Sequence, residues 1–273
     1  MKVLGHSVGR MYVSVIILLL FLAAASAYLL GQFPYALVLA TLACPVIEVL
    51  IRKYYQKQKF RFPFSGIITG LIIGCVAPIA VPLLPILVAC IAAVASKFFI
   101  KTKGANVFNP AAIGLLVLGV LSIGSSWWAA TSVNVYGVAV SLAIVLLFAA
   151  YESRRLVLAF AFIIASVLLS IAASPTLILG NVAIAFIGVN YFFAFLMLTE
   201  PKTSPAKIAE QAVYGVYVAV VYFLLVALLP PSLYFSAIII FVALLIGNLT
   251  YALYKKVGGL SGLSRQAVFT AGK

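Results

Sequence analysis

The acidic residues and the few side chains that could hold a metal are the first places to look for chemistry in this chain. Its 273 residues include four Glu, no Asp and a single His, His6, which lies in the N-terminal tail. Hydrolysis by an activated nucleophile needs a positioned base, and a metal site needs several ligands close together. The three Cys occur in apolar stretches without a CxxC spacing. The sequence therefore argues against a hydrolase and predicts no metal site and no disulfide framework.

Glu48 lies inside an apolar stretch, three residues after Pro45 of Cys44-Pro45. An acid within a membrane-spanning segment is normally either paired or functional. Arg52 follows four residues later on the same helical face, so an ion pair is one interpretation. An ion pathway for a cation or a proton past Glu48 is the other, and both stay open at this point.

A second candidate is the stretch Lys103–Ala112, which reads KGANVFNPAA. Asn109 is a good N-cap, and Pro110 suits the first position of a helix. The start of a helix also presents free N–H groups to an anion or a polarised carbonyl. A helix start alone would not require Asn106, Phe108 and Asn109 together, so we treat these three as candidate cofactor-binding residues.

A third candidate is the stretch Phe193–Pro205, which reads FAFLMLTEPKTSP. Thr199 and Glu200 precede Pro201, which is expected to end a helix. Turn chemistry alone explains such a segment. The alternative assigns Thr199 to a cofactor and Glu200, with Glu48, to an ion pathway.

Trp127 and Trp128 are the last candidates, in the connection 124–132. Adjacent Trp residues at a membrane interface usually anchor the protein there. They could also stack on a flat heterocycle.

Ten apolar stretches must position these residues. A helix needs about 20 apolar residues to cross the hydrocarbon, and in that environment the backbone must satisfy its own hydrogen bonds. The sequence therefore predicts an all-α, polytopic membrane bundle that forms one integral membrane domain, 1–273. The predicted spans are 11–31, 34–51, 64–77, 81–100, 108–123, 132–151, 155–173, 176–198, 212–230 and 233–254.

All 18 basic residues fall at the two ends of the chain, in the even-numbered connections or at the ends of the spans that flank those connections, while the odd-numbered connections carry no charge. This asymmetry predicts that both termini and all basic connections lie on the cytoplasmic side of the cell membrane. The formal charge of +14 then reflects short loops that contact anionic headgroups of the lipid bilayer, and it predicts no nucleic-acid partner. The basic residues are Lys2, Arg10, Arg52, Lys53, Lys57, Lys59, Arg61, Lys97, Lys101, Lys103, Arg154, Arg155, Lys202, Lys207, Lys255, Lys256, Arg265 and Lys273.

Two of the predicted spans are interrupted by small or polar residues. The third carries Gly66, Gly70 and Gly74, a stripe that favours close helix packing. The eighth contains Gly180-Asn181 and Gly188-Val189-Asn190. Ten spans divide into two inverted halves of five, in which these two spans correspond, and such a pair points to a central site.

The stretches NVFNPAAIG and FLMLTEPKTSP together resemble the RnfD/NqrB family, in which the corresponding motifs read roughly FNPA and TDP. The resemblance covers nearly the whole chain. It implies a ten-helix membrane subunit of an ion-translocating electron-transport complex, with other membrane and peripheral subunits as partners.

The resemblance also implies a flavin, FMN or riboflavin, because family members hold FMN on a Thr in an SGAT-like motif between spans 5 and 6. This chain has Trp128-Ala129-Ala130-Thr131 there, so Thr131 matches while the Ser and Gly do not. The Asp of TDP is Glu200 here, which keeps the charge. Two other functions stay open: an inverted-repeat transporter or channel for a small solute, and a structural subunit without a cofactor.

Overall fold

A computed structural model of the chain describes residues 2–3, 6–102, 105–131, 147–173, 185–186, 188–229 and 238–258. Within these ranges the chain is helical apart from its connections and two very short antiparallel strand pairs, which the sequence did not predict. The strand β1 (Lys2–Val3) pairs with β2 (His6–Ser7), and β3 (Lys101–Thr102) pairs with β4 (Ala105–Asn106). The all-α fold class is confirmed.

The helices follow the predicted spans to within a few residues. Five of those described are long and apolar enough to cross a membrane, so the protein is a multi-pass membrane protein. Spans 132–151 and 176–198 lie largely outside the described residues, so the count of ten stays a prediction. The elements are α1 (Val8–Leu30), α2 (Tyr35–Leu50) continued by the π-helical turn η1 (Ile51–Tyr55), α3 (Phe64–Val76), α4 (Leu83–Phe99), α5 (Pro110–Val120), α6 (Trp128–Thr131), α8 (Leu156–Ala173), η2 (Phe193–Met197), α11 (Ile208–Leu228) and α12 (Ile238–Val257).

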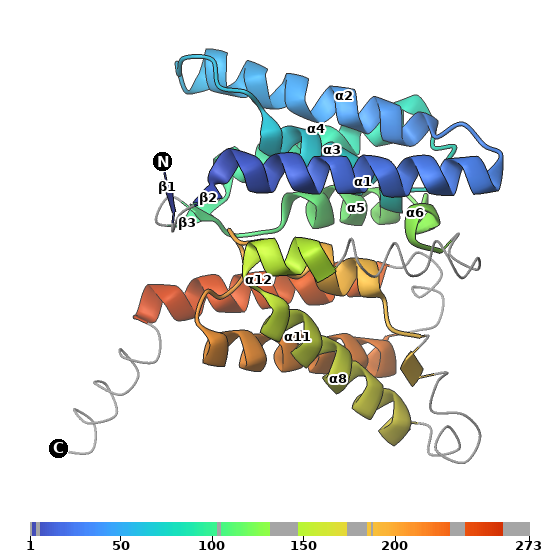
Figure 1. The fold of residues 1–273 in the computed structure, drawn as a ribbon, viewed down its shortest axis with the longest axis vertical. Helices are drawn as coiled ribbons and strands as arrows, with labels where there is room; N and C mark the ends of the chain where they lie inside the picture. The colour runs from blue at the N-terminus through green and yellow to red at the C-terminus, as the bar shows by residue number, and fades with distance from the viewer. Residues whose placement is uncertain are drawn as a thin grey trace.

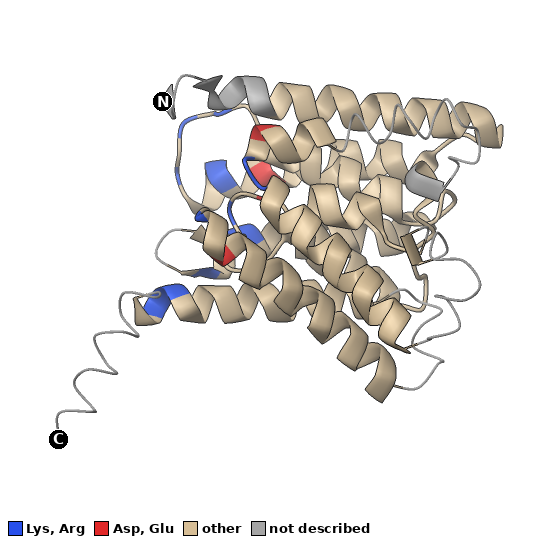
Figure 2. Ribbon diagram, turned by 60° about the horizontal axis from the view of Figure 1, so that its bottom comes forward, with Lys and Arg blue, Asp and Glu red and all other residues tan. Residues whose placement is uncertain are grey.

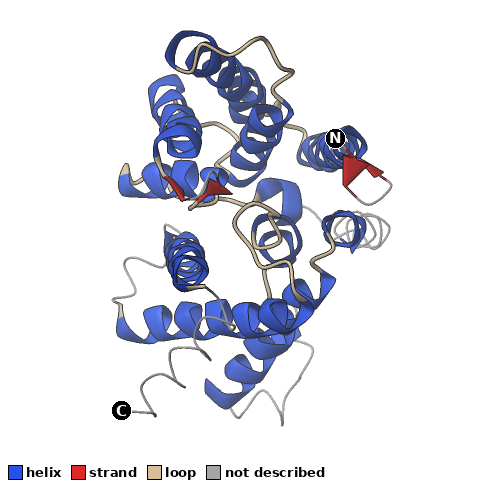
Figure 3. Cartoon of the chain, turned by 90° about the vertical axis from the view of Figure 1, so that its left-hand side faces the viewer, coloured by secondary structure: helices blue, strands red, loops and turns tan. Residues whose placement is uncertain are grey.

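The helices form two groups that lie one above the other in Figure 1. The upper group holds α1 to α6, in which α2 packs against α3 and α4. The lower group holds α8, α11 and α12, in which α11 packs against both others. Contact between α5 and α12 joins the groups, and Figure 3 shows the same helices from one end of the bundle.

Two helices near the centre are too short to cross a bilayer alone. With 13 and 11 residues, α3 and α5 are about 20 and 17 Å long at about 1.5 Å per residue. The hydrocarbon is about 30 Å thick. The N–H groups of Ser126 and Trp127 donate to Val76 O at 2.9 and 3.0 Å, and Trp128 Nε1 donates to Gly74 O at 2.8 Å. The connection before α6 therefore caps the carbonyl end of α3 inside the bundle.

The glycine stripe of α3 allows close helix packing, as predicted, and the helix that packs against it is α2. A Cβ atom on Gly70 would lie 2.2 Å from the carbonyl oxygen of Ala40, and one on Gly66 would lie 2.8 Å from Pro45 Cα. Only residues without a side chain allow the two backbones to approach this closely.

The described Lys and Arg residues gather at one end of the bundle, as Figure 2 shows. This end, called the charged end below, is where α1 begins and α12 ends. The sequence predicted this gathering from the alternation of charged and uncharged connections. All functional side chains discussed next lie at this end, except those beside α6.

Candidate functional site

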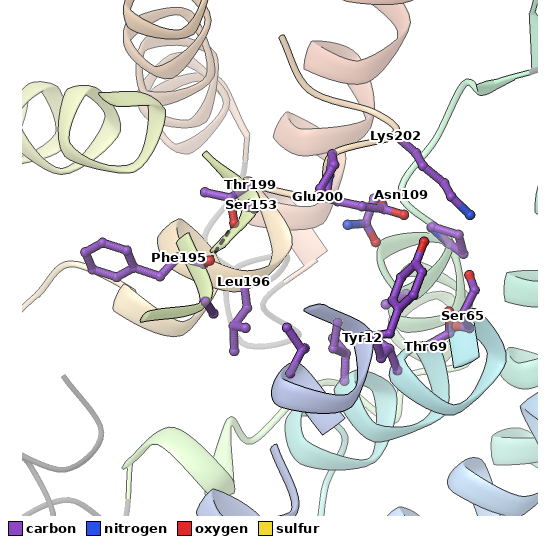
Figure 4. A pocket seen from close by; sticks show the side chains of 17 residues that line it. Tyr12, Ser65, Thr69, Asn109, Ser153, Phe195, Leu196, Thr199, Glu200 and Lys202 are labelled. Carbon is purple, nitrogen blue, oxygen red and sulfur yellow. Dashed lines mark hydrogen bonds between the residues drawn. The ribbon is translucent and has the colours of Figure 1, made fainter. Parts of the chain in front are cut away.

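A cavity of about 100 Å³ lies at the charged end, between α1, α3, α5, the helical residues 147–153 and the segment that follows η2. Figure 4 shows its lining. The structure thus brings together Asn109, Thr199 and Glu200, which the sequence singled out in two separate motifs. Polar groups in the lining come from Tyr12, Ser65, Thr69, Asn109, Ser153, Thr199, Glu200 and Lys202.

Glu200 brings the carboxylate to this cavity, and Figure 4 shows it extending toward Asn109 and Lys202. Burial raises the pKa of the Glu200 carboxyl above its ordinary value. The positive charges of Lys202 and Lys97 and a hydrogen bond from Thr203 Oγ1 at 3.3 Å act in the opposite direction and only partly offset that rise in pKa. The group is therefore placed to exchange a proton nearer to neutral pH than an exposed Glu would.

The segment that carries Glu200 is held in place by a tight turn. Ser204 Oγ donates to Glu200 O at 2.7 Å, and Arg155 Nε donates to Ser204 Oγ at 3.2 Å. Thr199 Oγ1 donates to Phe195 O, one turn back in η2. Because both Ser204 and Arg155 are buried, the turn is a fixed support for the acid and not a solvated loop.

Asn109 joins the two motifs through its backbone and its side chain. As predicted, it is the N-cap of α5, since its Oδ1 accepts from Ala112 N at 3.0 Å and Pro110 follows. Its Nδ2 also donates to Met197 O at 2.9 Å, at the end of η2. Its own N–H donates to Asn248 Oδ1 of α12 at 2.8 Å. Asn109 therefore fixes the start of α5 against the TEP segment, residues 199–201.

Glu48 takes part in a buried ion-pair cluster beside this cavity. It pairs with Arg52, as the spacing of four predicted, and also with Lys97 Nζ of α4 at 3.2 Å. Lys97 Nζ further donates to Ser65 O at 2.9 Å and to Ser65 Oγ at 3.1 Å. Glu48 and Lys97 are both buried, with exposed fractions of 0% and 5%.

Ser65 connects the ion-pair cluster to the cavity. It accepts from Lys97 and also lines the cavity on the side of α3. Lys97 pairs with Glu48, and its positive charge also acts to lower the pKa of Glu200. Ser65 therefore links the Glu48–Lys97 pair to the cavity that Glu200 also lines.

Asn106 and Phe108 do not line this cavity. Asn106 lines a smaller cavity with Lys202 and Asn248, on the other side of the TEP segment. Phe108 lines a larger cavity of about 510 Å³ beside α12. The three residues grouped from the sequence therefore face three different spaces.

Trp127, Trp128 and Thr131 lie near α6, at the opposite end of the bundle from the charges. Trp127 is stacked on Phe241 with 5.6 Å between ring centroids, and Trp128 is buried with its indole N–H bonded to α3. Protein groups pack around both rings, and stacking on a flavin stays a prediction. The side chain of Thr131 lies outside the described residues.

The size and lining of the main cavity indicate what it can hold. At about 30 Å³ per water, 100 Å³ has room for roughly three water molecules. Pockets for drug-sized ligands measure about 300–1,000 Å³, so this cavity is smaller than a typical site for a molecule of that size. Hydroxyl, amide and carboxylate oxygens are suitable partners for water and for hard cations. The arrangement can take up a proton or a small, partly hydrated cation.

Sequence reasoning missed three residues of this region. Lys97 was counted only as one of the basic residues of a connection, whereas it lies within α4 and is buried against Glu48. Asn248 and Tyr214 were not singled out; Asn248 Nδ2 donates to Tyr214 Oη at 2.8 Å. The sequence signal that could have identified Lys97 and Asn248 is a Lys or Asn within an apolar span, since such residues need a hydrogen-bonding or charged partner there.

Comparisons with known proteins agree with the resemblance seen in the motifs. Residues 3–132 match the NQR2, RnfD, RnfE family. A 76-residue stretch is 36% identical to a protein of Buchnera aphidicola subsp. Schizaphis graminum (strain Sg) that is described as a subunit of an ion-translocating oxidoreductase complex. That stretch covers 27% of this chain and 22% of the relative.

Proposed function

We propose, on the premise that residues 3–132 belong to the NQR2, RnfD, RnfE family, that this chain is a membrane subunit of an ion-translocating oxidoreductase complex. The relative from Buchnera carries that description. The complex supplies further membrane and peripheral subunits, through which electrons enter and leave. The chain lies in the cell membrane with the charged end on the cytoplasmic side.

The cavity at the charged end is the place where this subunit takes up the coupling ion. The observation that carries this proposal is that residues of both motifs line one polar cavity. Glu200 is part of its lining, and Glu48 pairs with Lys97, which donates to Ser65 in the same lining. A partly buried acid whose protonated form is favoured by burial can release its proton when a cation arrives or when a nearby charge changes. Ser65 and Lys97 then transmit that change to Glu48.

A tagged chain purified from its own membranes tests the proposal. We expect redox subunits to co-purify, and we expect the reconstituted complex to take up Na⁺ or H⁺ when given the electron donor and acceptor that those subunits use. Glu200→Gln should lower ion uptake per electron, while Lys59→Gln, an exposed charge at the same end, should leave it unchanged. A chain that purifies alone and conducts a small solute in liposomes would establish the transporter interpretation instead.

A flavin on Thr131 remains part of the proposal, and it rests on the resemblance of the sequence around that residue. When bound, FMN would supply one-electron and two-electron chemistry at the uncharged end. In-gel ultraviolet fluorescence of the denatured protein detects a covalent flavin. Fluorescence that Thr131→Ala abolishes would support attachment there, and a wild-type chain without fluorescence would contradict it.

A further inference from the structure

A second, larger cavity lies at the charged end and shares no lining residue with the polar cavity. It measures about 510 Å³ and lies between the end of α4, the β3–β4 hairpin and α12. Its lining is apolar except for Thr102 and two lysines, Lys101 and Lys256. We propose that this cavity binds one anionic phospholipid, with its phosphate between Lys101 and Lys256 and an acyl chain along α12.

The apolar wall is suited to an acyl chain. Leu249 and Leu253 are one turn apart on α12, and Phe99 and Ile100 end α4. All four are exposed in this chain. In a membrane-spanning protein such residues face the hydrocarbon, where a chain lying along them keeps the apolar surface covered.

The charges of the lining favour an anionic headgroup. Both lysines are exposed, and the lining contains no acid. Among the described residues, no ion pair involves Lys101 or Lys256. Each lysine near a membrane surface contributes attraction to anionic lipid, whereas a zwitterionic headgroup brings its own cation to the same place.

The position in the fold favours a lipid over a soluble ligand. The lysines lie at the charged end, where Figure 2 shows the basic residues, and the apolar wall runs from there along α12. In a bilayer, a phospholipid likewise has its headgroup at the interface and its acyl chain in the hydrocarbon below it. A free phosphate would use the lysines and leave the wall uncovered.

Native mass spectrometry of the detergent-purified chain tests this site, by titration with dioleoyl phosphatidylglycerol and, separately, dioleoyl phosphatidylcholine. We expect one phosphatidylglycerol molecule to bind tightly and phosphatidylcholine to bind more weakly. At about 1 kcal/mol for each lysine, Lys101→Gln and Lys256→Gln should each weaken phosphatidylglycerol binding about fivefold, and the double variant about 30-fold. The matched control is Lys57→Gln/Lys59→Gln, which removes two exposed charges from another connection at the same end.

Thermal unfolding gives an independent measurement, because a ligand that binds only the folded protein raises its unfolding temperature. Phosphatidylglycerol should stabilise the wild type and the control variant more than the Lys101/Lys256 double variant. Equal binding in all three proteins would overturn the proposal, and so would an equal loss in the control. Equal displacement of the lipid by glycerol phosphate, which has no acyl chain, would show that the apolar wall plays no part.

Discussion

The buried cation Lys97 offers the sharpest test of the polar region, through the substitution Lys97→Met. Methionine fills a similar volume but removes the partner of Glu48 Oε2 at 3.2 Å and the donor to Ser65. Removing one partner of a buried ion pair costs about 3–5 kcal/mol. Arg52 still pairs with the other oxygen of Glu48 and is partly exposed, so we expect a cost of about 3 kcal/mol, at the lower end of that range.

Such a loss is large enough to measure in detergent. At roughly 2–4 °C per kcal/mol for a chain of this size, the unfolding temperature should fall by roughly 6–12 °C. Size-exclusion chromatography after heating, detected by Trp fluorescence, follows the folded fraction. Lys53→Met is the matched control, since it removes an exposed lysine from η1 and should change the unfolding temperature little.

A double-mutant cycle decides whether the pair itself is responsible. Glu48→Gln alone should also destabilise the protein, because it removes the negative charge that pairs with the buried Lys97. The double variant Glu48→Gln/Lys97→Met should be less destabilised than the sum of the two single variants, by about 2 kcal/mol. Additivity within about 0.5 kcal/mol would refute the ion-pair argument.

Three further predictions address the packing, the network and the acid. Gly70→Ala places a Cβ 2.2 Å from a carbonyl oxygen of α2 and should destabilise the chain by at least about 1–3 kcal/mol; an unchanged unfolding temperature would show that α2 and α3 can separate freely. Asn248→Leu leaves the buried N–H of Asn109 without its acceptor and should cost about 1–3 kcal/mol, whereas Thr250→Val, on the exposed side of α12, should cost much less by the same thermal assay. Because burial raises the pKa of Glu200, the folded state holds this proton more tightly than the unfolded state, so stability should fall as pH rises from the ordinary carboxyl range through the raised pKa. Glu200→Gln should flatten that part of the pH profile of thermal stability and stabilise the protein at neutral pH; a profile identical to that of the wild type would contradict the assigned shift.

Local features of the sequence were enough to predict the class of the protein and most of its helices. Apolar runs of sufficient length can be satisfied in a membrane only as helices, which explains why the bounds of α2 and α3 agree so closely with the predicted spans. The N-cap at Asn109 and the Glu48–Arg52 pair are also local, since each depends on residues three or four positions apart. The glycine stripe of α3 could be recognised for the same reason.

What only the tertiary structure decided is which distant residues meet. The pairing of Lys97 with Glu48 joins residues 49 positions apart, and the bond between Asn109 and Asn248 joins residues 139 apart. No periodicity encodes such contacts, because they depend on how the helices pack and not on the pattern within any one of them. The burial of Trp127 under Phe241 follows from the same packing, and the sequence alone placed that residue at the interface. The sequence itself determined that charge lies at one end, whereas the packing of α2, α3 and α4 determined which of those charged residues contact each other.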